Sequence, residues 1–203
     1  MTQHQVAQYL LESEAIYLRP DDPFTWSSGI KSPIYCDNRQ LISQVEARNF
    51  LIDHFSKLIQ ENYPHVDYIA GTSTAGIPWA AWIANKLEKP MIYVRSSKKD
   101  HGRENLIEGK FRRGSSVVVI EDLISTGGSS LKVIEALQSE QALVLSLIAI
   151  FSYEFRIAAA SFSEKNIPVH TLCDFSTLLK CATSLSKISS VQAEQIFQWK
   201  NQY

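Results

Sequence analysis

Residues 117–130 read Val-Val-Val-Ile-Glu-Asp-Leu-Ile-Ser-Thr-Gly-Gly-Ser-Ser, and no other stretch constrains the fold of this chain as strongly. The four β-branched residues at its start have no polar interruption, which predicts a strand buried on both faces, as in a parallel sheet. Glu121 and Asp122 follow where we expect that strand to end. A Ser/Thr/Gly turn and a helical pattern from Leu131 come next, so the segment predicts strand, acidic tip, turn and helix N-terminus.

This order of elements predicts a ligand site. Ligands in open α/β sheets bind at the carboxyl ends of the strands, and the N–H groups of a turn at a helix start favour a phosphate. Paired carboxylates suit ribose hydroxyls or Mg²⁺ instead. Alone, Glu121 and Asp122 are as easily read as two solvated acids, but the glycines after them allow a ligand to approach the backbone closely. We therefore predict a phosphorylated sugar with Mg²⁺ as the ligand.

Two other nucleotide sites are excluded by the same stretch. It contains no G-x-G-x-x-G pattern, which argues against a dinucleotide site, and no Gly-Lys-Ser/Thr, which argues against a P-loop.

The composition is that of an ordinary globular enzyme. The chain has 203 residues, enough for one domain with a full core, and a formal net charge of −1, which gives no electrostatic case for binding nucleic acid or an anionic membrane. Its N-terminus lacks the features of a signal peptide, and no apolar run approaches a membrane span. The cysteines Cys36, Cys173 and Cys181 lack CxxC spacing, which favours reduced thiols over disulfides or a zinc site. We expect a cytoplasmic location.

Strands and helices alternate along the chain, which predicts one α/β domain with a parallel β-sheet flanked by helices. We expect strands at 66–70, 91–94, 117–120, 142–151 and 169–172, and helices at 6–14, 43–62, 77–87, 131–137, 154–165, 174–181 and 189–199. Capping patterns predict that Ser43 with Glu46, and Ser189 with Gln192, begin two of these helices. The sequence pattern of residues 24–37 predicts an irregular hairpin. That of residues 95–109 predicts a long mobile loop. The core would take about 41–172, and a small hood about 1–40 plus the C-terminal segment, within a single domain of residues 1–203.

Three stretches together resemble a known family. Residues 117–130 resemble the phosphoribosyl pyrophosphate (PRPP) signature of type I phosphoribosyltransferases: a hydrophobic strand, two acids, two further residues and a Ser/Thr/Gly turn. Residues 93–102, Tyr-Val-Arg-Ser-Ser-Lys-Lys-Asp-His-Gly, resemble the catalytic loop of orotate phosphoribosyltransferases, and residues 24–35 resemble that family's substrate segment. Residues 71–76 match its pyrophosphate loop, so the likeness covers essentially the whole chain.

The resemblance implies a reaction and its residues. Orotate and PRPP would give orotidine 5′-monophosphate and pyrophosphate, with Lys99, His101 and Asp122 as catalytic residues. Ser125 would contact orotate, and Mg²⁺ would be bound mainly through PRPP rather than by direct protein ligands. The family also implies a homodimer whose 95–109 loop is shared across subunits. The implied PRPP-binding residues are Arg95, Lys99, His101, Glu121, Asp122, Leu123, Ile124, Ser125, Thr126, Gly127, Gly128 and Ser129.

The chain departs from the family pattern at three places. Some relatives have a lysine where this chain has Ser27 and another where it has Ala75, and Lys31 and Lys98 are the nearest replacements. Some relatives also use an arginine after the strand ending near residue 151; here Arg156 lies a few residues late and is as easily read as a surface residue.

Two other functions compete with this reading. A PRPP-sensing regulator without catalysis would need a nucleic-acid-binding surface, against which the near-neutral charge and the retained Lys99 and His101 argue. A purine phosphoribosyltransferase is nearer, but the purine enzymes lack the Lys-Asp-His-Gly loop.

Overall fold

A six-stranded sheet forms the centre of the computed structural model, which describes residues 2–26, 29–96 and 106–203. The strand order is β10-β9-β8-β5-β6-β7, and every neighbouring pair is parallel except β6 and β7, which are antiparallel. The parallel sheet that the sequence predicts is therefore confirmed, with one antiparallel strand added at its edge. The strands are β5 (Tyr68–Thr72), β6 (Met91–Val94), β7 (Ile107–Glu108), β8 (Ser116–Ile124), β9 (Leu143–Ser152) and β10 (Val169–Asp174).

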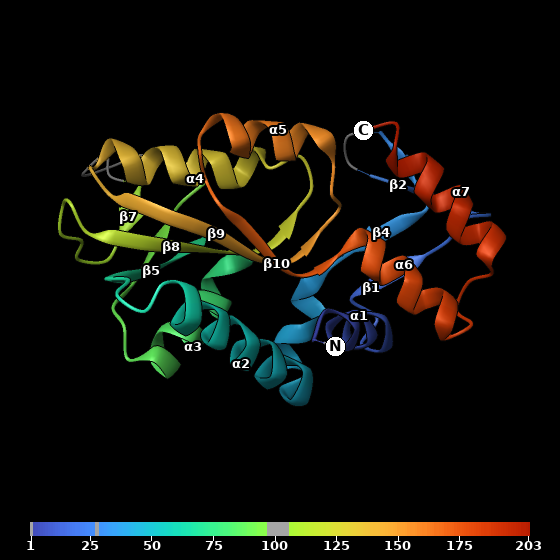
Figure 1. Ribbon diagram of the computed structural model, residues 1–203, viewed down its shortest axis with the longest axis horizontal. Helices are drawn as coiled ribbons and strands as arrows, with labels where there is room; N and C mark the ends of the chain where they lie inside the picture. Colours follow the sequence, from blue (N-terminus) through green and yellow to red (C-terminus); the bar gives the residue numbers. More distant parts are fainter. Residues whose placement is uncertain (1, 27–28, 97–105) are drawn as a thin grey trace.

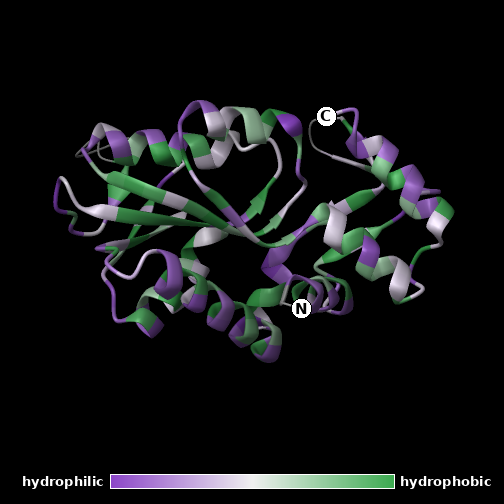
Figure 2. Cartoon of the chain, viewed as in Figure 1, coloured by the Kyte–Doolittle hydropathy of each residue, from purple (hydrophilic) through white to green (hydrophobic). Residues whose placement is uncertain are grey.

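Helices cover both faces of this sheet (Figure 1). One face carries α4 (Gly128–Ser139) and α5 (Arg156–Glu164), and the opposite face carries α2 (Val45–Asn62) and α3 (Gly76–Leu87). Figure 2 shows the central strands as mainly hydrophobic, while each helix alternates hydrophobic and hydrophilic residues. In β8, residues 117–120 are fully buried, because helices cover both sides of the strand.

The remaining elements form a smaller part, at the right of Figure 1, which we call the hood. It is built from both ends of the chain and carries two small antiparallel sheets, β1 with β4 and β2 with β3. A 3₁₀ helix, η1 (Asn38–Ser43), connects it to α2. The hood elements are α1 (Thr2–Glu12), β1 (Ile16–Leu18), β2 (Phe24–Thr25), β3 (Lys31–Ser32), β4 (Ile34–Cys36), α6 (Phe175–Ser184) and α7 (Ser190–Lys200).

Several local expectations are confirmed. The β2–β3 pair is the irregular hairpin that residues 24–37 predict. Ser189 and Gln192 form the expected capping box of α7, and the Asp174 side chain caps α6 by accepting from the N–H of Thr177 at 2.7 Å. The cysteines Cys36, Cys173 and Cys181 are buried free thiols. None of the helices in the described ranges combines the length and hydropathy needed to cross a membrane.

Three expectations are wrong. Ser43 does not cap α2: it ends η1, its hydroxyl donates to the Gln40 carbonyl at 3.4 Å, and Gln44 is the residue before the helix. Strand β8 does not end before the acids but continues to Ile124, because β9 pairs with it as far as Ser152. The segment expected as one loop over 95–109 contains β7, whose residues pair with β6; residues 97–105 lie outside the described part of the chain.

Candidate active site

Glu121 and Asp122 lie in the last part of β8, at the carboxyl edge of the sheet. Glu121 is only 5% exposed and accepts three hydrogen bonds. The donors are the Thr72 hydroxyl at 2.6 Å, the Ser130 hydroxyl at 2.9 Å and the Asp122 N–H at 3.1 Å. Because Thr72 comes from β5 and Ser130 from α4, Glu121 ties the neighbouring strand to the helix that follows its own strand.

Asp122 has a different environment. It is partly exposed, and its backbone carbonyl accepts a 2.6 Å hydrogen bond from the Asn38 side chain of η1. Burial, followed by the charge of the adjacent Glu121, raises the pKa of Asp122 from 3.8 to about 8. The two acids thus resist carrying two negative charges at neutral pH, which makes this edge a place where a cation or hydroxyl donors are favoured.

The turn after β8 exposes backbone N–H groups at the start of α4. Gly127 precedes the helix with φ = +81°, and a Cβ there would lie 2.9 Å from the Phe162 ring, so both conformation and space require glycine. A glycine offers no side chain to cap the helix. The exposed Thr126, Gly128 and Ser129 therefore surround N–H groups that are available to an anion.

The second glycine turn follows β5. Its Ser73–Thr74 peptide bond is cis, and both the N–H and the hydroxyl of Ser73 donate to the Val94 carbonyl, at 3.2 and 2.6 Å. A Cβ on Gly76 would lie 2.5 Å from the Ile120 carbonyl oxygen, so only glycine lets α3 start this close to β8. Ala75, where some family members have lysine, is the residue immediately before α3.

A cavity of about 450 Å³, which we call the α4 cavity, joins the two turns. Arg95 lines it and is also 3.6 Å from Glu108 of β7. The cavity brings Arg95 together with Ser73 of one turn and Ser129 of the other. It also contains Lys132, a residue for which the sequence analysis predicts no role. The lining residues are Ser73, Val94, Arg95, Ser96, Leu106, Ser129, Lys132, Val133 and Glu135.

A cavity of about 410 Å³, which we call the hood cavity, lies on the hood side of β8. Ser125 lines it, so the turn that presents N–H groups also reaches this second space. Trp26 and Tyr153 meet edge to face with ring centres 5.4 Å apart, and burial raises the pKa of the Cys36 thiol. The lining residues are Thr25, Trp26, Tyr35, Cys36, Leu123, Ser125 and Tyr153.

The sequence reading did not find Tyr153 or Asn38. Tyr153 directly follows β9, where some relatives have an arginine, and that position was the only signal for it. Arg156, the nearest arginine, is an exposed residue at the start of α5 and is not among the described residues that line the hood cavity. Asn38 gave no signal, because its contact with Asp122 spans 84 positions of the chain.

Other expected site residues are placed as follows. Lys98, Lys99 and His101 of the predicted catalytic loop, and Ser27 of the hairpin, lie outside the described residues. Ile124 is only 2% exposed as a whole residue, and its carbonyl accepts from the Tyr153 N–H at 2.9 Å, so the structure gives it a role in placing the turn rather than an open surface for a ligand.

The described residues offer no group of three or more His, Cys, Asp or Glu side chains that could hold a metal ion. The carboxylates of Glu121 and Asp122 are oxygen donors of the kind Mg²⁺ prefers, and one or two protein carboxylates with substrate phosphates are its usual ligands. The pair therefore fits an ion that arrives with a phosphorylated substrate.

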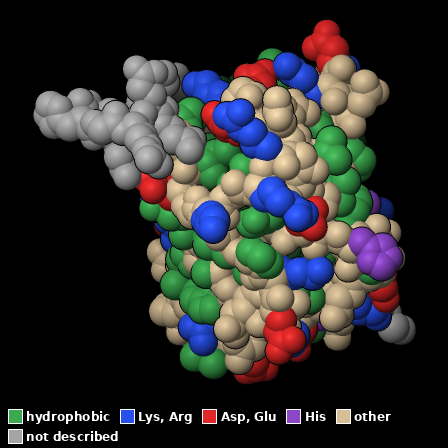
Figure 3. Space-filling view, turned by 90° about the vertical axis from the view of Figure 1, so that its left-hand side faces the viewer, with side chains coloured by type: hydrophobic (Ala, Val, Ile, Leu, Met, Phe, Trp, Pro, Cys, Tyr) green, Lys and Arg blue, Asp and Glu red, His purple; other side chains and the backbone are tan. Residues whose placement is uncertain are grey.

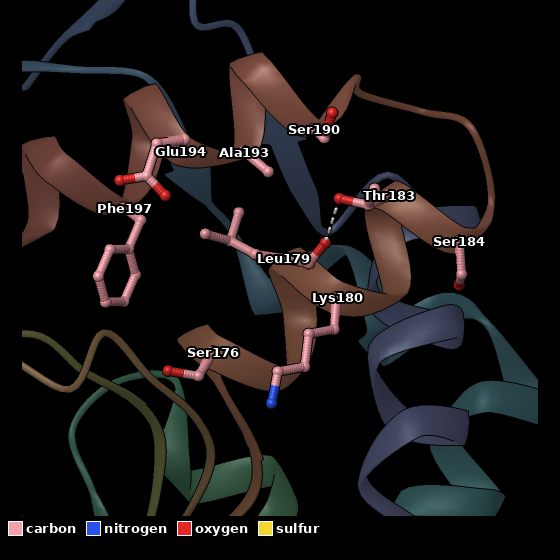
Figure 4. Close-up of a pocket in the computed structure, with 9 residues that line it drawn as sticks. All are labelled: Ser176, Leu179, Lys180, Thr183, Ser184, Ser190, Ala193, Glu194 and Phe197. Carbon is pink, nitrogen blue, oxygen red and sulfur yellow. Dashed lines mark hydrogen bonds between the residues drawn. The ribbon is translucent and has the colours of Figure 1, made fainter.

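Two surface features lie outside this site. A groove of about 670 Å³ runs between α6 and α7, where the Thr183 hydroxyl donates to the Leu179 carbonyl at 2.9 Å (Figure 4). On the face shown in Figure 3, basic side chains are scattered among acidic and hydrophobic ones rather than gathered into a basic patch. Among the ion pairs of the described chain, Arg113 is 2.9 Å from Glu140.

Comparison with known proteins identifies the relatives of the chain. The model of the phosphoribosyl transferase domain family matches residues 41–168. An orotate phosphoribosyltransferase of Staphylococcus aureus (strain MSSA476) is 50% identical over 197 residues, which are 97% of each chain. One from Fusobacterium nucleatum is 49% identical over 203 residues, covering 99% of this chain and 96% of its own.

The fold is also similar to solved structures. The crystal structure of orotate phosphoribosyltransferase from Aeropyrum pernix has a TM-score of 0.79 and 27% identity, and the match covers 91% of this chain and 99% of that one. The similarity therefore extends over most of the described fold.

Proposed function

The chain belongs to the orotate phosphoribosyltransferase family, and on that premise we propose which of its residues carry the transfer of phosphoribose from PRPP to orotate. The products of this reaction, a step of pyrimidine biosynthesis, are orotidine 5′-monophosphate and pyrophosphate. The observation that carries the assignment of residues is the meeting of an acid pair, a glycine turn and an aromatic cavity around the end of β8. Ser125 belongs to the turn and also lines the cavity, so donor and acceptor would meet there.

The turn at residues 125–129 binds the 5′-phosphate of PRPP. Its backbone N–H groups, at the positive end of the α4 dipole, provide donors without a large side chain in the way. Leu123 and Ile124 place the turn, and the left-handed Gly127 lets the chain enter the helix beneath the phosphate.

The acids bind the ribose. Asp122 has the freer carboxylate and is the group that contacts the 2′- and 3′-hydroxyls, while Glu121, held by Thr72 and Ser130, fixes its position and adds charge. As the bond to pyrophosphate breaks, positive charge develops on the sugar ring. A negative group fixed next to that ring stabilises it in the transition state more than in the ground state.

Pyrophosphate leaves toward the α4 cavity. Arg95 lines this cavity together with Ser73, so the turn that follows β5 would lie beside the departing group. We propose that Lys99 and His101 complete the positive surroundings from the 95–109 loop, neutralising charge as it develops on the leaving group. Closure of the loop would exclude water and so prevent hydrolysis of PRPP.

The cofactor is Mg²⁺, bound mainly through PRPP, with Glu121 and Asp122 as the nearest protein carboxylates. When bound, the ion makes pyrophosphate a better leaving group by neutralising its oxygens. The raised pKa of Asp122 supports this role: burial is its main cause, and the second cause, the negative charge of Glu121, would also favour a cation at this place.

Orotate binds in the hood cavity. A volume of about 410 Å³ and walls that include Trp26, Tyr35 and Tyr153 suit a small planar base, with Ser125 as a polar partner. The aromatic faces would hold the ring, and the backbone near Tyr35 would meet its edge.

The enzyme acts as a homodimer with the 95–109 loop shared between subunits, as in its family. A cytoplasmic location is supported by the three free thiols, which are typical of a reducing compartment.

The assay follows the absorbance of orotate in the presence of PRPP, Mg²⁺ and the protein. We expect PRPP-dependent loss of the orotate signal and formation of orotidine 5′-monophosphate. A parallel series with adenine, guanine and hypoxanthine as competitors tests the acceptor. Turnover of a purine, or no change with orotate at high enzyme concentration, would refute the assignment.

A further inference from the structure

The hood cavity has a wall that depends on the C-terminal helix. Trp26 forms this wall, and it directly follows β2 of the β2–β3 hairpin. Each strand of that hairpin is only two residues long, and a sheet of two short strands is marginally stable by itself. The position of Trp26 must therefore depend on contacts outside the hairpin.

Besides the Tyr153 ring and the Ile34 carbonyl, which accepts from the indole N–H of Trp26 at 3.4 Å, Trp26 contacts Trp199 near the end of α7. Trp199 is 9% exposed and meets the Trp26 ring edge to face, with centres 5.9 Å apart. Its indole N–H donates to the Lys31 carbonyl of β3 at 2.9 Å. One side chain thus holds the hairpin at two points, a ring contact and a backbone hydrogen bond.

Trp199 is also linked to Tyr153, the aromatic residue of the hood cavity that the Trp26 ring contacts directly. Its ring lies 5.9 Å from that of Phe155, and Phe155 stacks on Tyr153 with ring centres 5.3 Å apart and an angle of 15° between the planes. Tyr203 closes the group, with its ring 5.4 Å from both Phe155 and Trp199. Trp26 and Tyr153 are therefore both linked to α7.

A second tie comes from the start of the same helix. The Gln192 side chain donates to Asp21, in the turn before β2, at 2.8 Å. The helix thus spans the hairpin from its entry at Asp21 to its return at Lys31.

We propose that Trp199 is a positioning residue for the acceptor base: it sets the distance between Trp26 and Tyr153 and so controls orotate affinity without touching PRPP. The proposal rests on the assignment of the hood cavity to orotate. It predicts an effect on one substrate alone, because the Ser125–Ser129 turn and the acids of β8 have no contact with α7 among the interactions described above.

The test compares Trp199→Phe with Phe197→Leu. Trp199→Phe keeps an aromatic ring but removes the N–H that holds the Lys31 carbonyl. Phe197 lies on the same helix and is 37% exposed, and its ring packs against Lys200 of that helix rather than pairing with a ring of the hairpin in the described part of the chain. Phe197→Leu is therefore the matched control. The Michaelis constant for orotate is measured at saturating PRPP, and that for PRPP at saturating orotate.

We expect Trp199→Phe to raise the KM for orotate about threefold to tenfold, as for loss of one hydrogen bond, with the KM for PRPP unchanged. Phe197→Leu should leave both constants at wild-type values. An unchanged KM for orotate, or an equal rise in both constants, overturns the proposal. Absence of orotate turnover in the wild-type protein would instead refute the assignment of function.

A second variant covers the case in which Trp199→Phe does not fold. Tyr203→Ala removes a ring that packs against both Trp199 and Phe155 near the end of the chain. We expect it to raise the KM for orotate about twofold or more. A folded Tyr203→Ala protein with a wild-type KM for orotate also overturns the proposal.

Discussion

Replacing Asp122 with asparagine should make the ligand-free protein more stable at alkaline pH and nearly inactive. Asparagine has almost the same shape but carries no charge, so it mimics the protonated acid. In the free site that protonated form is favoured, because burial and the neighbouring Glu121 raise the pKa of Asp122 to about 8. The substitution therefore removes a group that the fold holds in an unfavourable state above neutral pH.

The size of the effect follows from proton linkage. In the unfolded chain an aspartate has a pKa near 3.8, so between about pH 4 and pH 8 the folded protein holds one proton that the unfolded chain has lost. The free energy of unfolding then falls as pH rises, by at most about 1.4 kcal/mol per pH unit from this group. The contribution of this proton to the free energy of unfolding is fully present below pH 4 and is lost as pH rises through the pKa of the folded state. The free energy of unfolding of Asp122→Asn lacks this dependence on pH.

The experiment measures urea unfolding of both proteins at pH 5, 6, 7 and 8 without ligands. We expect the stability of Asp122→Asn relative to wild type to increase steadily over this range, by at least about 1 kcal/mol in total. In activity the wild type should exceed the variant: kcat/KM of Asp122→Asn should be lower by about 100-fold or more, because the amide cannot supply negative charge to the sugar ring.

Asp67→Asn is the matched control, since Asp67 shows the opposite shift. Its carboxylate accepts from the N–H and hydroxyl of Ser116, and these bonds lower its pKa. A lowered pKa gives stability that is present above the unfolded value and lost only as pH falls through the folded value. Asp67→Asn should therefore run parallel to wild type from pH 5 to 8. If the curves of Asp122→Asn and wild type are also parallel, the repulsion between the two acids is not as we describe it.

Three further predictions test the site, one of them with a matched control substitution. Thr72→Val removes the 2.6 Å hydrogen bond to the buried Glu121 and should lower the free energy of unfolding by about 1.5–3 kcal/mol in urea; an unchanged value would mean that the bond has no net worth. Gly76→Ala places a methyl group 2.5 Å from the Ile120 carbonyl oxygen and should lower the free energy of unfolding by about 3 kcal/mol. Gly128→Ala is its control: a Cβ there would have no atom within 4 Å, so the free energy of unfolding should change by less than about 0.5 kcal/mol. Similar losses of stability in the two variants would contradict the packing argument. Lys99→Ala should lower kcat with an unchanged urea midpoint, and wild-type steady-state constants would remove Lys99 from the mechanism.

The donor half of the site could be predicted from the sequence because it is local in the chain. A run of β-branched residues, two acids and a glycine turn occupy consecutive positions, and a buried strand followed by a helix leaves few geometries for them. The end of the strand was misplaced, since pairing with β9 carries β8 past both acids to Ile124. Hydrogen bonding between distant strands leaves no mark on the local pattern.

The acceptor half could be predicted only through family resemblance. Its walls combine Trp26 near the start of the chain with Tyr153 after β9, and neither residue has a periodic pattern around it. The sequence does not predict β1 or β7, because each has three residues or fewer and forms only where a partner strand is present. At Ser43 the sequence predicts a feature that does not form. The local pattern is that of a helix cap, but Ser43 belongs to η1, which Asp37 caps through its side chain.

The two halves of the proposed site tolerate substitution differently, and this difference bears on how the acceptor base is selected. The PRPP side depends on backbone N–H groups and on glycines at places where a Cβ would collide with Phe162 or the Ile120 carbonyl, so few substitutions there are compatible with the fold. The side that we propose for orotate depends on aromatic rings from three separate segments that meet in the hood. Such rings can be exchanged or shifted without disturbing the strand-to-helix turn. The acceptor can therefore change through the hood and α7 while the donor site stays constant, which explains why the PRPP signature by itself does not identify the base.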